Sequence, residues 1–510
     1  MQKLHPIMFV GTGSDVGKSL IAAAFCRIFK QDGWHPAPFK AQNMALNSFA
    51  TQEGLEIGRA QAVQAEAAGI KCHTDMNPLL LKPQSGHTCQ VVLNGKPLGS
   101  RTAYDFWEKG GKQEKCDDGK GRPKIDFRDE VCQAFDRLEK RYNPIVMEGA
   151  GSISEMNLSK TDIVNMPMAQ HAGADVFLVA DIDRGGVFAS VYGSIALQSP
   201  QDRARIKGLI INKFRGDMRL FDEGKKLLEQ LCGIPVLGII PYFKDIHIEE
   251  EDSVALAQKP MHAKHGKVNI AVVLLQHLSN YTDFNALEHD QRVHLFYTNN
   301  VEDLAKADII IIPGSKSTLN DLYEMRRNGV AKTIVEAYRN GAGVLGICGG
   351  FQLMGVEVCD PDHVEGCIGQ LPGLGLLPTT TTITTAKTTR QVRFSIQSAP
   401  SGTPMSGYEI HQGVTKPFGD APARPLAVLE DGQEDGYFVN GRCMGTYLHG
   451  ILDNAAFIDF LLAPFAHKVG QASAPFDYAQ FKEEQYDRLA QHIRQHVDIN
   501  KIYKILKDND

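Results

Sequence analysis

The sequence predicts an α/β fold with two domains in tandem, each organised around a mostly parallel sheet. Apolar runs of strand length alternate with segments of helix length through most of the 510 residues. This alternation is typical of parallel strands that are covered by helices on both faces. One hydrophobic core does not extend over a chain of this length, so at least two domains are expected.

The predicted strands fall into two groups. The first group forms a doubly wound sheet in the N-terminal domain and consists of Ile7–Val10, Ile145–Met147, Val176–Ala180, Leu209–Ile211 and Val236–Ile240. The second group begins after a charged stretch at residues 249–252 and consists of Val268–Leu275, Ile309–Ile312 and Val344–Ile347. We therefore expect a domain boundary near residue 260.

Three other segments have a recognisable character. Tyr478–Val497 is expected to be an amphipathic helix docked on the protein, because apolar residues recur in it at helical spacing, namely Tyr486, Leu489, Ile493 and Val497. Glu108–Lys124 is rich in Gly, Lys and Asp, and Thr379–Thr389 is rich in the β-prone residue threonine. We interpret these last two stretches as surface insertions.

The composition is that of an ordinary globular protein, with 43% hydrophobic and 22% charged residues. A formal net charge of −6, with basic residues scattered along the chain, argues against a nucleic-acid partner. No apolar run reaches the length of a membrane span, and the stretch Ile7–Val10 is too short for a secretory signal. The ten cysteines form no CxxC pair, so we expect reduced thiols in a cytoplasmic protein.

A glycine-rich loop follows the first predicted strand, with the sequence Gly11-Thr12-Gly13-Ser14-Asp15-Val16-Gly17-Lys18-Ser19. A strand, such a loop and a helix (here Leu20–Phe29) together cradle phosphates on backbone N–H groups. Lys18 is expected to reach the β- and γ-phosphates of a nucleotide, and the Ser19 hydroxyl to bind Mg²⁺. The loop is a variant, because the usual pattern places its first glycine where this chain has Thr12.

Two later strand ends supply further candidates for the nucleotide site. Glu148 ends the strand predicted at Ile145–Met147, and a carboxylate at the C-terminal end of a parallel strand suits a Mg²⁺ ligand. Its alternative role is to cap the next helix. Asn212 follows the strand predicted at Leu209–Ile211, and with Lys213 it resembles a base-recognition element.

The most informative motif of the second domain is Gly346-Ile347-Cys348-Gly349-Gly350. It predicts a sharp turn that presents the Cys348 thiol as a nucleophile and leaves the Gly349 N–H facing a developing oxyanion. The alternative is a cysteine that simply ends a core strand. Gly314, in the turn Pro313-Gly314-Ser315, is the candidate second oxyanion donor, and His449, one of 17 histidines, is the candidate base.

The nucleotide motifs together resemble the dethiobiotin-synthetase-like ATPases. The resemblance rests on the loop, Phe39-Lys40, the Glu148-Gly149-Ala150-Gly151 turn and Asn212-Lys213. It implies that ATP phosphorylates a substrate carboxylate and that Lys40 lies near the transferred phosphate. Regulatory switches of the same superfamily carry a signature lysine where this chain has Gly13, which disfavours that branch.

The elbow, the turn at Gly314 and the late histidine resemble class I glutamine amidotransferase domains, which have a flavodoxin-like fold. In that family the thiolate attacks the side-chain amide of glutamine, forms a thioester and releases ammonia. The family usually has a glutamate two residues after the histidine, and this chain has Ile451 there. Either another acceptor orients His449, with the polar 407–413 segment as one source, or Cys348 and His449 work as a dyad.

The two domains in this order resemble the cobyrinate amidotransferases and, within them, the cobyric acid synthases. Long motifs carry the resemblance, at residues 39–48, 56–62, 181–186 and 212–217. The resemblance implies glutamine- and ATP-dependent amidation, with Mg²⁺, of the b, d, e and g carboxylates of adenosylcobyrinic acid a,c-diamide, giving adenosylcobyric acid. The alternatives are an a,c-diamide synthase and a regulatory switch with an inert glutaminase-like domain.

The resemblance also divides the chain and names candidate substrate residues. Residues 1–260 are expected to form the ATP-dependent amide-forming domain, residues 267–465 the glutaminase domain, and residues 466–510 a C-terminal helical extension. Corrinoid contacts are expected from Gln42, Asn43, Asn47, Asp183 and Arg184. For Asp183 and Arg184 the alternative is a local surface ion pair. The oligomeric state is left open.

Overall fold

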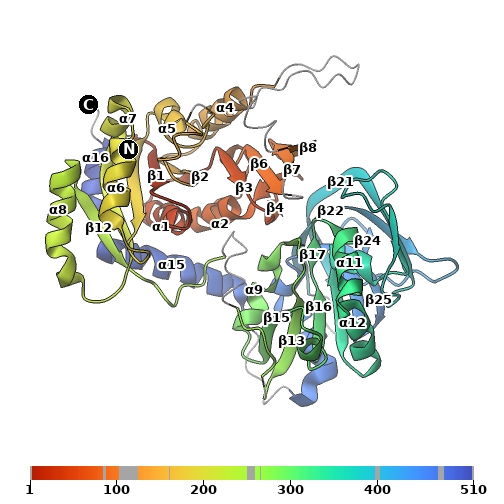
Figure 1. Ribbon diagram of the computed structural model, residues 1–510. Coiled ribbons are helices and arrows are strands. Elements are labelled where there is room, and N and C mark those ends of the chain that lie inside the picture. Colours follow the sequence, from red (N-terminus) through yellow and green to blue (C-terminus); the bar gives the residue numbers. More distant parts are fainter. Residues whose placement is uncertain are drawn as a thin grey trace. The chain divides into compact units, whose positions relative to one another are not determined.

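Two sheets of mostly parallel strands organise the chain, one in each of two units (Figure 1). The computed structural model describes residues 3–83, 88–102, 125–159, 161–249, 259–264, 266–396, 403–468 and 476–507. Unit 1 comprises Met1–Ala45, Ile57–Ile248 and Phe481–Asp510, and unit 2 comprises Leu46–Glu56 and Glu249–Gln480. Relative to the division predicted from the sequence, unit 2 gains a short N-terminal segment and unit 1 gains the C-terminal helices.

The central sheet of unit 1 has six parallel strands in the order β12-β11-β10-β1-β9-β2. Their bounds are β1 Ile7–Gly11, β2 Ala37–Phe39, β9 Ile145–Glu148, β10 Asp175–Asp181, β11 Ile206–Phe214 and β12 Val236–Pro241. The five strands predicted for this sheet are present. The glycine-rich loop follows β1, whose neighbours are β9 and β10, so the three strands deliver their C-terminal residues to one edge.

Helices cover this sheet. They are α1 Lys18–Gln31, α2 Arg59–Ala68, α4 Phe127–Glu139, α5 Met166–Ala172, α6 Val187–Ala196, α7 Pro200–Arg205, α8 Asp222–Cys232, α15 Tyr478–His496 and α16 Ile499–Lys507. One apolar core joins β1, α1, α2, α15 and α16. The predicted C-terminal amphipathic helix is confirmed as α15, because Tyr486, Leu489 and Ile493 are buried in this core (Figure 1, blue).

A smaller sheet of unit 1 has the order β3-β6-β7-β8. Its strands are β3 Gln42–Met44, β6 Leu79–Pro83, β7 Thr88–Leu93 and β8 Lys96–Thr102. This sheet places part of the 39–48 motif on β3. The insertion predicted at Glu108–Lys124 lies outside the described residues.

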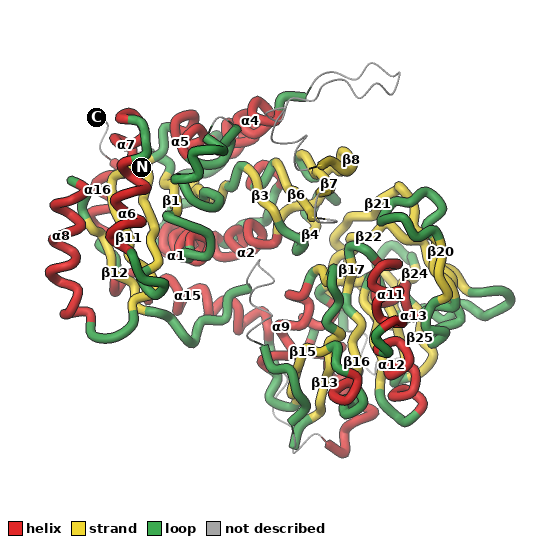
Figure 2. Tube along the Cα trace, viewed as in Figure 1, coloured by secondary structure: helices red, strands yellow, loops and turns green. Residues whose placement is uncertain are grey.

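The main sheet of unit 2 has the order β15-β13-β16-β18-β26-β25, with only the edge strand β25 antiparallel. Its strands are β13 Val268–Val273, β15 Val293–Thr298, β16 Ile309–Ile312, β18 Gly343–Ile347, β25 Tyr437–Asn440 and β26 Cys443–Thr446. The unit's helices are α9 Asn285–His289, α10 Val301–Leu304, α11 Thr318–Arg327, α12 Val330–Arg339, α13 Gly349–Met354 and α14 Ala455–Leu462. Figure 2 shows α11 and α12 side by side along the strands.

A second sheet of unit 2 follows the path β20-β19-β21-β22-β27, with β23 and β24 attached to β21. Its strands are β19 Glu357–Cys359, β20 Gln370–Pro372, β21 Thr379–Ile396, β22 Met405–Pro417, β23 Ala427–Leu429, β24 Glu434–Asp435 and β27 Leu448–His449. The surface insertion predicted at Thr379–Thr389 was wrong, because this run is the first part of β21. Thr379 and Thr381 are 1% and 0% exposed, so alternate threonines pack inside the sheet.

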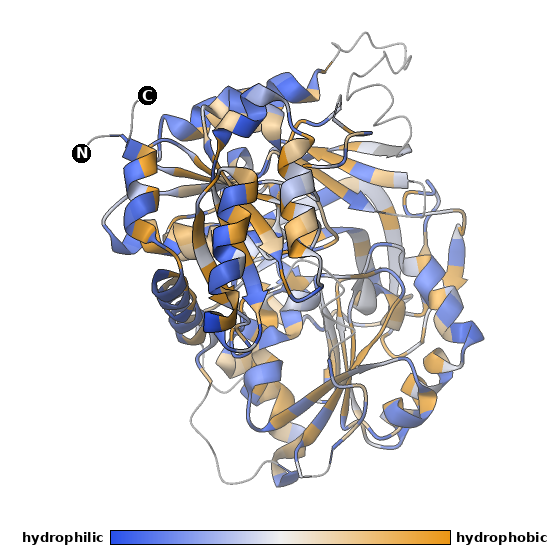
Figure 3. Cartoon of the chain, turned by 60° about the vertical axis from the view of Figure 1, so that its left-hand side comes forward, coloured by the Kyte–Doolittle hydropathy of each residue, from blue (hydrophilic) through white to orange (hydrophobic). Residues whose placement is uncertain are grey.

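Short strands complete the fold, namely β4 Ser48–Ala50 with β5 Glu56–Gly58, and β14 Leu278–Ser279 with β17 Gly314–Ser315. In the main sheet of each unit the strands are largely apolar, and the helices carry both an apolar and a polar side (Figure 3). Across the described ranges, no helix combines the length and the apolar character that crossing a membrane requires. The nine cysteines within the same ranges are all free thiols.

Candidate functional site

The motif around Cys348 forms the sharp turn that the sequence predicted. Strand β18 ends at Ile347, and Cys348 adopts φ 51° and ψ −109°, a conformation that is strained for a residue with a side chain. A Cβ atom at Gly350 would lie 1.8 Å from the Ile312 carbonyl oxygen, and one at Gly346 would lie 2.6 Å from the Met354 sulfur. Only glycine therefore fits on both sides of this elbow.

The side chain that orients His449 is Asp283, in the short 3-10 turn Tyr281–Phe284. His449 Nδ1–H donates a 2.7 Å hydrogen bond to Asp283 Oδ2, and the Gly450 N–H donates to Asp283 Oδ1 at 3.1 Å. His449 is 1% exposed and Asp283 is 4% exposed. Asp283 is thus the acceptor that orients His449 in this chain, which has Ile451 where the resembled family usually has a glutamate. Sequence inspection missed it because Asp283 stands at no fixed offset from the histidine.

Burial and charge act in opposite directions on His449. Burial disfavours the imidazolium, but the charge and hydrogen bond of Asp283, with a contribution from the hydrogen bond to Cys348, raise the pKa of His449 to about 10. The imidazole therefore carries a proton at neutral pH and faces the cysteine as a cation. His449 is therefore placed to act as a proton donor beside Cys348.

The turn that carries Gly314 lies between the elbow and the histidine. A Cβ atom at Gly314 would lie 3.7 Å from His449 Cε1, and one at Gly349 would lie 2.7 Å from the Ser315 backbone nitrogen. Both candidate oxyanion donors are thus close to Cys348 or His449. Their role in binding an oxyanion stays a prediction.

A pair of buried side chains supports this turn. Ser315 Oγ–H donates to Asp321 Oδ2 at 2.6 Å, and His277 Nδ1 lies 3.0 Å from Asp321 Oδ1. Asp321 is 1% exposed, and its hydrogen bond is the main cause of the raised pKa of His277. Neither His277 nor Asp321 was among the site residues predicted from the sequence.

The polar 407–413 segment contributes neighbours of the site and does not supply the orienting carboxylate. The Tyr408 ring lies nearly parallel to the His449 imidazole, with centroids 5.3 Å apart. Cys348 Sγ lies 3.6 Å from the Ile410 carbonyl oxygen. Glu409 instead pairs with Arg390.

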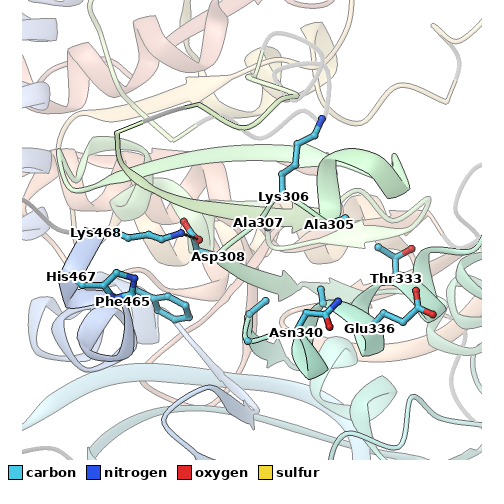
Figure 4. A pocket seen from close by; sticks show the side chains of 13 residues that line it. Ala305, Lys306, Ala307, Asp308, Thr333, Glu336, Asn340, Phe465, His467 and Lys468 are labelled. Atoms are coloured by element: carbon cyan, nitrogen blue, oxygen red, sulfur yellow. Dashed lines mark hydrogen bonds and ion pairs between the residues drawn. The ribbon is translucent and has the colours of Figure 1, made fainter.

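A pocket of about 390 Å³ lies at the other edge of the same sheet (Figure 4). Its lining includes Asp308, which precedes β16, and Ala342, which precedes β18. Cys348 follows β18, so the pocket and the thiol are at opposite ends of parallel strands. Asp308 pairs there with Lys468. The pocket is therefore separate from the glutaminase candidate residues.

In unit 1 the glycine-rich loop surrounds the Lys18 amine. Lys18 Nζ donates to the carbonyl oxygens of Gly13 and Gly151, both at 2.9 Å. A Cβ atom at Gly11 would lie 2.8 Å from the same nitrogen, which explains a glycine at this position of the variant loop. Gly17, with φ 98°, turns the chain into α1.

Glu148 is the centre of a buried polar cluster at the end of β9. Ser19 Oγ–H and Lys40 Nζ donate to its Oε1 at 2.7 and 2.9 Å, and Gln64 Nε2 donates to its Oε2 at 2.7 Å. Burial opposes the charge, but Lys40 and the hydrogen bonds hold the pKa of Glu148 below its ordinary value. The side chain does not cap a helix. Gln64 was not among the predicted site residues.

The oxygen donors of this cluster fit a magnesium ion. Mg²⁺ prefers oxygen ligands and keeps several waters or phosphate oxygens, so one hydroxyl and one carboxylate suffice from the protein. Among the described residues no group of three or more His, Cys, Asp or Glu is arranged to hold a metal. Ser19 and Glu148 would therefore share the ion with the nucleotide.

Asn212 lies on the flank of the glycine-rich loop. Its Nδ2 donates to the Val16 carbonyl oxygen at 2.8 Å, and a Cβ atom at Gly17 would lie 2.2 Å from it. Its neighbour Lys213 forms an ion pair with Asp181 at 3.0 Å. The structure thus joins the loop and the Asn212 segment at one edge of the sheet.

The candidate substrate residues fall into three groups, according to the part of the chain that carries them. Arg184 is largely exposed and lies 3.3 Å from Asp15, whereas Asp183 pairs with Arg215 at 2.7 Å, so the two do not pair with each other. Gln42 and Asn43 are buried on β3. Asn47 is buried in unit 2. Their contact with a corrinoid stays a prediction.

Two family models match the chain, one in each half. Residues 7–254 match the CobQ/CobB/MinD/ParA nucleotide binding domain, and residues 269–457 match the CobB/CobQ-like glutamine amidotransferase domain. The first span contains the Lys18 and Glu148 cluster, and the second contains Cys348, His449 and Asp283. The two geometric sites therefore fall in domains of the corresponding kinds.

Similar proteins match over the whole length. A cobyric acid synthase of Bacteroides fragilis is 67% identical over 509 residues, covering 100% of both chains. One of Phocaeicola vulgatus is 66% identical over 510 residues, again covering 100% of both. One of Citrobacter koseri is 46% identical over 518 aligned positions, covering 99% of this chain and 98% of its own. The chain belongs to the cobyric acid synthase family.

Proposed function

We propose that this protein uses ATP and glutamine to amidate the b, d, e and g carboxylates of adenosylcobyrinic acid a,c-diamide, giving adenosylcobyric acid. The observation that carries the proposal is 67% identity over 509 residues to a cobyric acid synthase. The two geometric sites support it, because each supplies one half of the chemistry. A carboxylate becomes reactive only after activation, and an amide nitrogen has to be released from glutamine.

In the nucleotide site, the γ-phosphoryl group of ATP passes to a substrate carboxylate and forms an acyl phosphate with ADP as the leaving group. Lys18 and Lys40 stabilise the charge on the transferring group. Ser19 and Glu148 would hold the Mg²⁺, which would neutralise phosphate charge. Ammonia then attacks the acyl carbon and phosphate leaves, so one ATP is spent for each amide.

In the glutaminase site, the Cys348 thiolate attacks the side-chain amide carbon of glutamine. The tetrahedral oxyanion faces the N–H groups of Gly314 and Gly349. His449, already protonated, donates its proton to the departing amine, and ammonia leaves as the thioester forms. The imidazole then takes a proton from water, whose oxygen attacks the thioester and releases glutamate.

Product mass tests this proposal directly. The protein is incubated with ATP, Mg²⁺, glutamine and either the diamide or unamidated cobyrinic acid, and the corrinoid is followed by mass spectrometry. Four carboxylate-to-amide changes on the diamide support the proposal. Two on the unamidated acid indicate an a,c-diamide synthase, and ATP hydrolysis without amidation indicates a switch. Cys348→Ser should lose glutamine use and keep ammonia use, because the two sites are chemically separate.

A further inference from the structure

The short segment Leu46–Glu56 belongs to unit 2, although its sequence lies deep inside the N-terminal half. It forms a hairpin in which Ser48 Oγ–H donates to Glu56 Oε1 at 2.8 Å and the Thr51 N–H donates to the Leu55 carbonyl at 2.7 Å. The hairpin is held against the second sheet of unit 2. Gln391 Nε2 donates to the Ala50 carbonyl at 3.0 Å.

A buried ion pair and an apolar contact anchor the hairpin more firmly. Lys387 of β21 pairs with Glu56, and their side chains are only 7% and 1% exposed. The Phe49 ring contacts the Tyr408 ring edge-on, with centroids 4.6 Å apart. Ala50, Tyr408 and Ile410 form one buried apolar cluster. These contacts are extensive enough to make the hairpin part of the glutaminase fold.

The hairpin ends in the surroundings of the catalytic histidine. The Ser48 N–H donates to Asn280 Oδ1 at 3.1 Å, and the Asn280 Nδ2 atom lies 3.4 Å from His449 Nδ1. The Tyr408 hydroxyl donates to the Ser48 carbonyl at 3.4 Å, and the Tyr408 ring lies along the His449 imidazole. The two backbone groups of one residue therefore hold two side chains that contact His449.

The structure assigns to Leu46–Glu56 a positioning role: it fixes Asn280 and Tyr408 around His449 and thereby links corrinoid binding to glutamine hydrolysis. This inference rests on the proposed function, because the segment continues directly from Gln42 and Asn43, the candidate corrinoid residues. Asn47, another candidate, is the residue before Ser48. A substrate bound at these residues pulls on the same stretch of backbone.

The hydrogen bonds make this link sensitive to small displacements. A bond of 3.1 Å is lost when donor and acceptor separate beyond about 3.5 Å, so a shift of Ser48 by roughly half an ångström reaches Asn280. Coupling between two sites of one protein commonly amounts to about 5–150-fold in affinity, and for binding it is reciprocal. A corrinoid effect on glutamate release should fall in this range.

The test compares glutamate release with and without the diamide and a non-hydrolysable ATP analogue. The full-length wild type should show at least a fivefold change in kcat/KM for glutamine. Lys387→Met combined with Glu56→Gln removes both charges of this ion pair together. In this variant the ratio of kcat/KM measured with the diamide and the ATP analogue to kcat/KM measured without them should be close to one. Lys416→Met, an exposed lysine on β22, is the matched control and should keep the wild-type ratio.

A second variant protects the test against loss of folding. Tyr408→Phe keeps the ring beside His449 and removes the hydroxyl that reaches Ser48, so the ratio should move towards one without loss of the folded state in thermal melts. A wild-type ratio of one, or an unchanged ratio in both variants, overturns the inference. Amidation with added ammonia bypasses glutamine hydrolysis. A failure of ammonia-dependent amidation contradicts the proposed function, whereas a wild-type ratio far from one that moves towards one in both variants supports the link by itself.

Discussion

Asp283 accepts a 2.7 Å hydrogen bond from His449, although the two residues are 166 positions apart and lie in different elements of unit 2. Asp283→Asn removes the charge that keeps the imidazole protonated. We expect kcat for glutamate release to fall by roughly 10²–10⁴-fold, as in other sites where the residue behind a catalytic histidine is lost. Amidation with added ammonia should remain at the wild-type rate.

The pH dependence of the same variant reports the cause of the loss. The pKa of His449 is raised to about 10, so the wild-type histidine stays protonated below that pH. Without the carboxylate, burial pulls the pKa of His449 down from this value, so kcat/KM for glutamine should begin to fall at a lower pH in the variant than in the wild type. A variant whose pH profile has the same shape as that of the wild type would mean that Asp283 acts only through structure.

Glu148→Gln should impair amidation and spare glutamate release, which is the opposite of the effect expected for Asp283→Asn. The substitution keeps the shape of the side chain but removes the charge that Lys40 and Ser19 face. We expect amidation to fall roughly 10²-fold or more with either glutamine or ammonia, because the carboxylate that would hold the Mg²⁺ beside the phosphates is lost. Glutamate release measured without ATP or corrinoid should persist. Glu155→Gln, an exposed acid further along the same loop, is the matched control.

The strands and the elbow could be predicted because their signals are local. Ile309–Ile312 is a continuous apolar run, and the glycines around Cys348 sit where a Cβ atom would collide with backbone. Asp283 could not be predicted, since it occupies a short 3-10 turn with no periodicity and meets its partner only through tertiary packing. The Thr379 run was misassigned because threonine suits both the exposed and the buried face of a strand.

The hairpin at Leu46–Glu56 shows the same limit over longer distances. Its bonds join residues 331 and 360 positions apart, Lys387 with Glu56 and Tyr408 with Ser48. A pattern read along the chain contains no trace of such pairs. Ser48 and Glu56 were, however, visible as parts of two family motifs, at residues 39–48 and 56–62. These motifs thus indicated the family, but they did not predict that residues Leu46–Glu56 belong to unit 2.

The hydrogen bonds beneath the Gly314 turn should affect the rate of glutamine hydrolysis. Ser315→Ala removes the 2.6 Å bond to Asp321 and frees the turn, so kcat for glutamate release should fall roughly tenfold to a hundredfold. KM for glutamine should change less than kcat, because the oxyanion forms only as the reaction proceeds. Ammonia-dependent amidation should be unaffected.

His277 offers a matched pair of variants for the same support. His277→Asn places an amide donor near the position of Nδ1 and should keep the bond to Asp321, now 3.0 Å, and most of the activity. His277→Leu leaves the buried Asp321 without this donor and should behave like Ser315→Ala. Equal activity of the two His277 variants would contradict a positioning role for the hydrogen bond.

The buried carboxyl group of Asp435 should make the stability of unit 2 depend on pH. Burial raises the pKa of Asp435 from 3.8 to about 6, despite the hydrogen bonds from Thr446 and the Tyr447 N–H. A carboxyl group whose pKa is raised on folding contributes its full stability below its unfolded pKa and loses it as pH rises through the folded value. Unit 2 should therefore lose roughly 3 kcal/mol between about pH 4 and pH 6 from this group.

Asp435→Asn should remove that loss, because the amide stays neutral and can donate to the Thr446 hydroxyl, which then accepts. In urea unfolding the variant should match the wild type at pH 4 and exceed it at pH 7. Glu434→Gln, the exposed neighbour on β24, should follow the wild type at both pH values. An Asp435→Asn protein that is less stable at pH 7 would mean that the carboxylate is held ionised by its hydrogen bonds, which would place its pKa below the ordinary value.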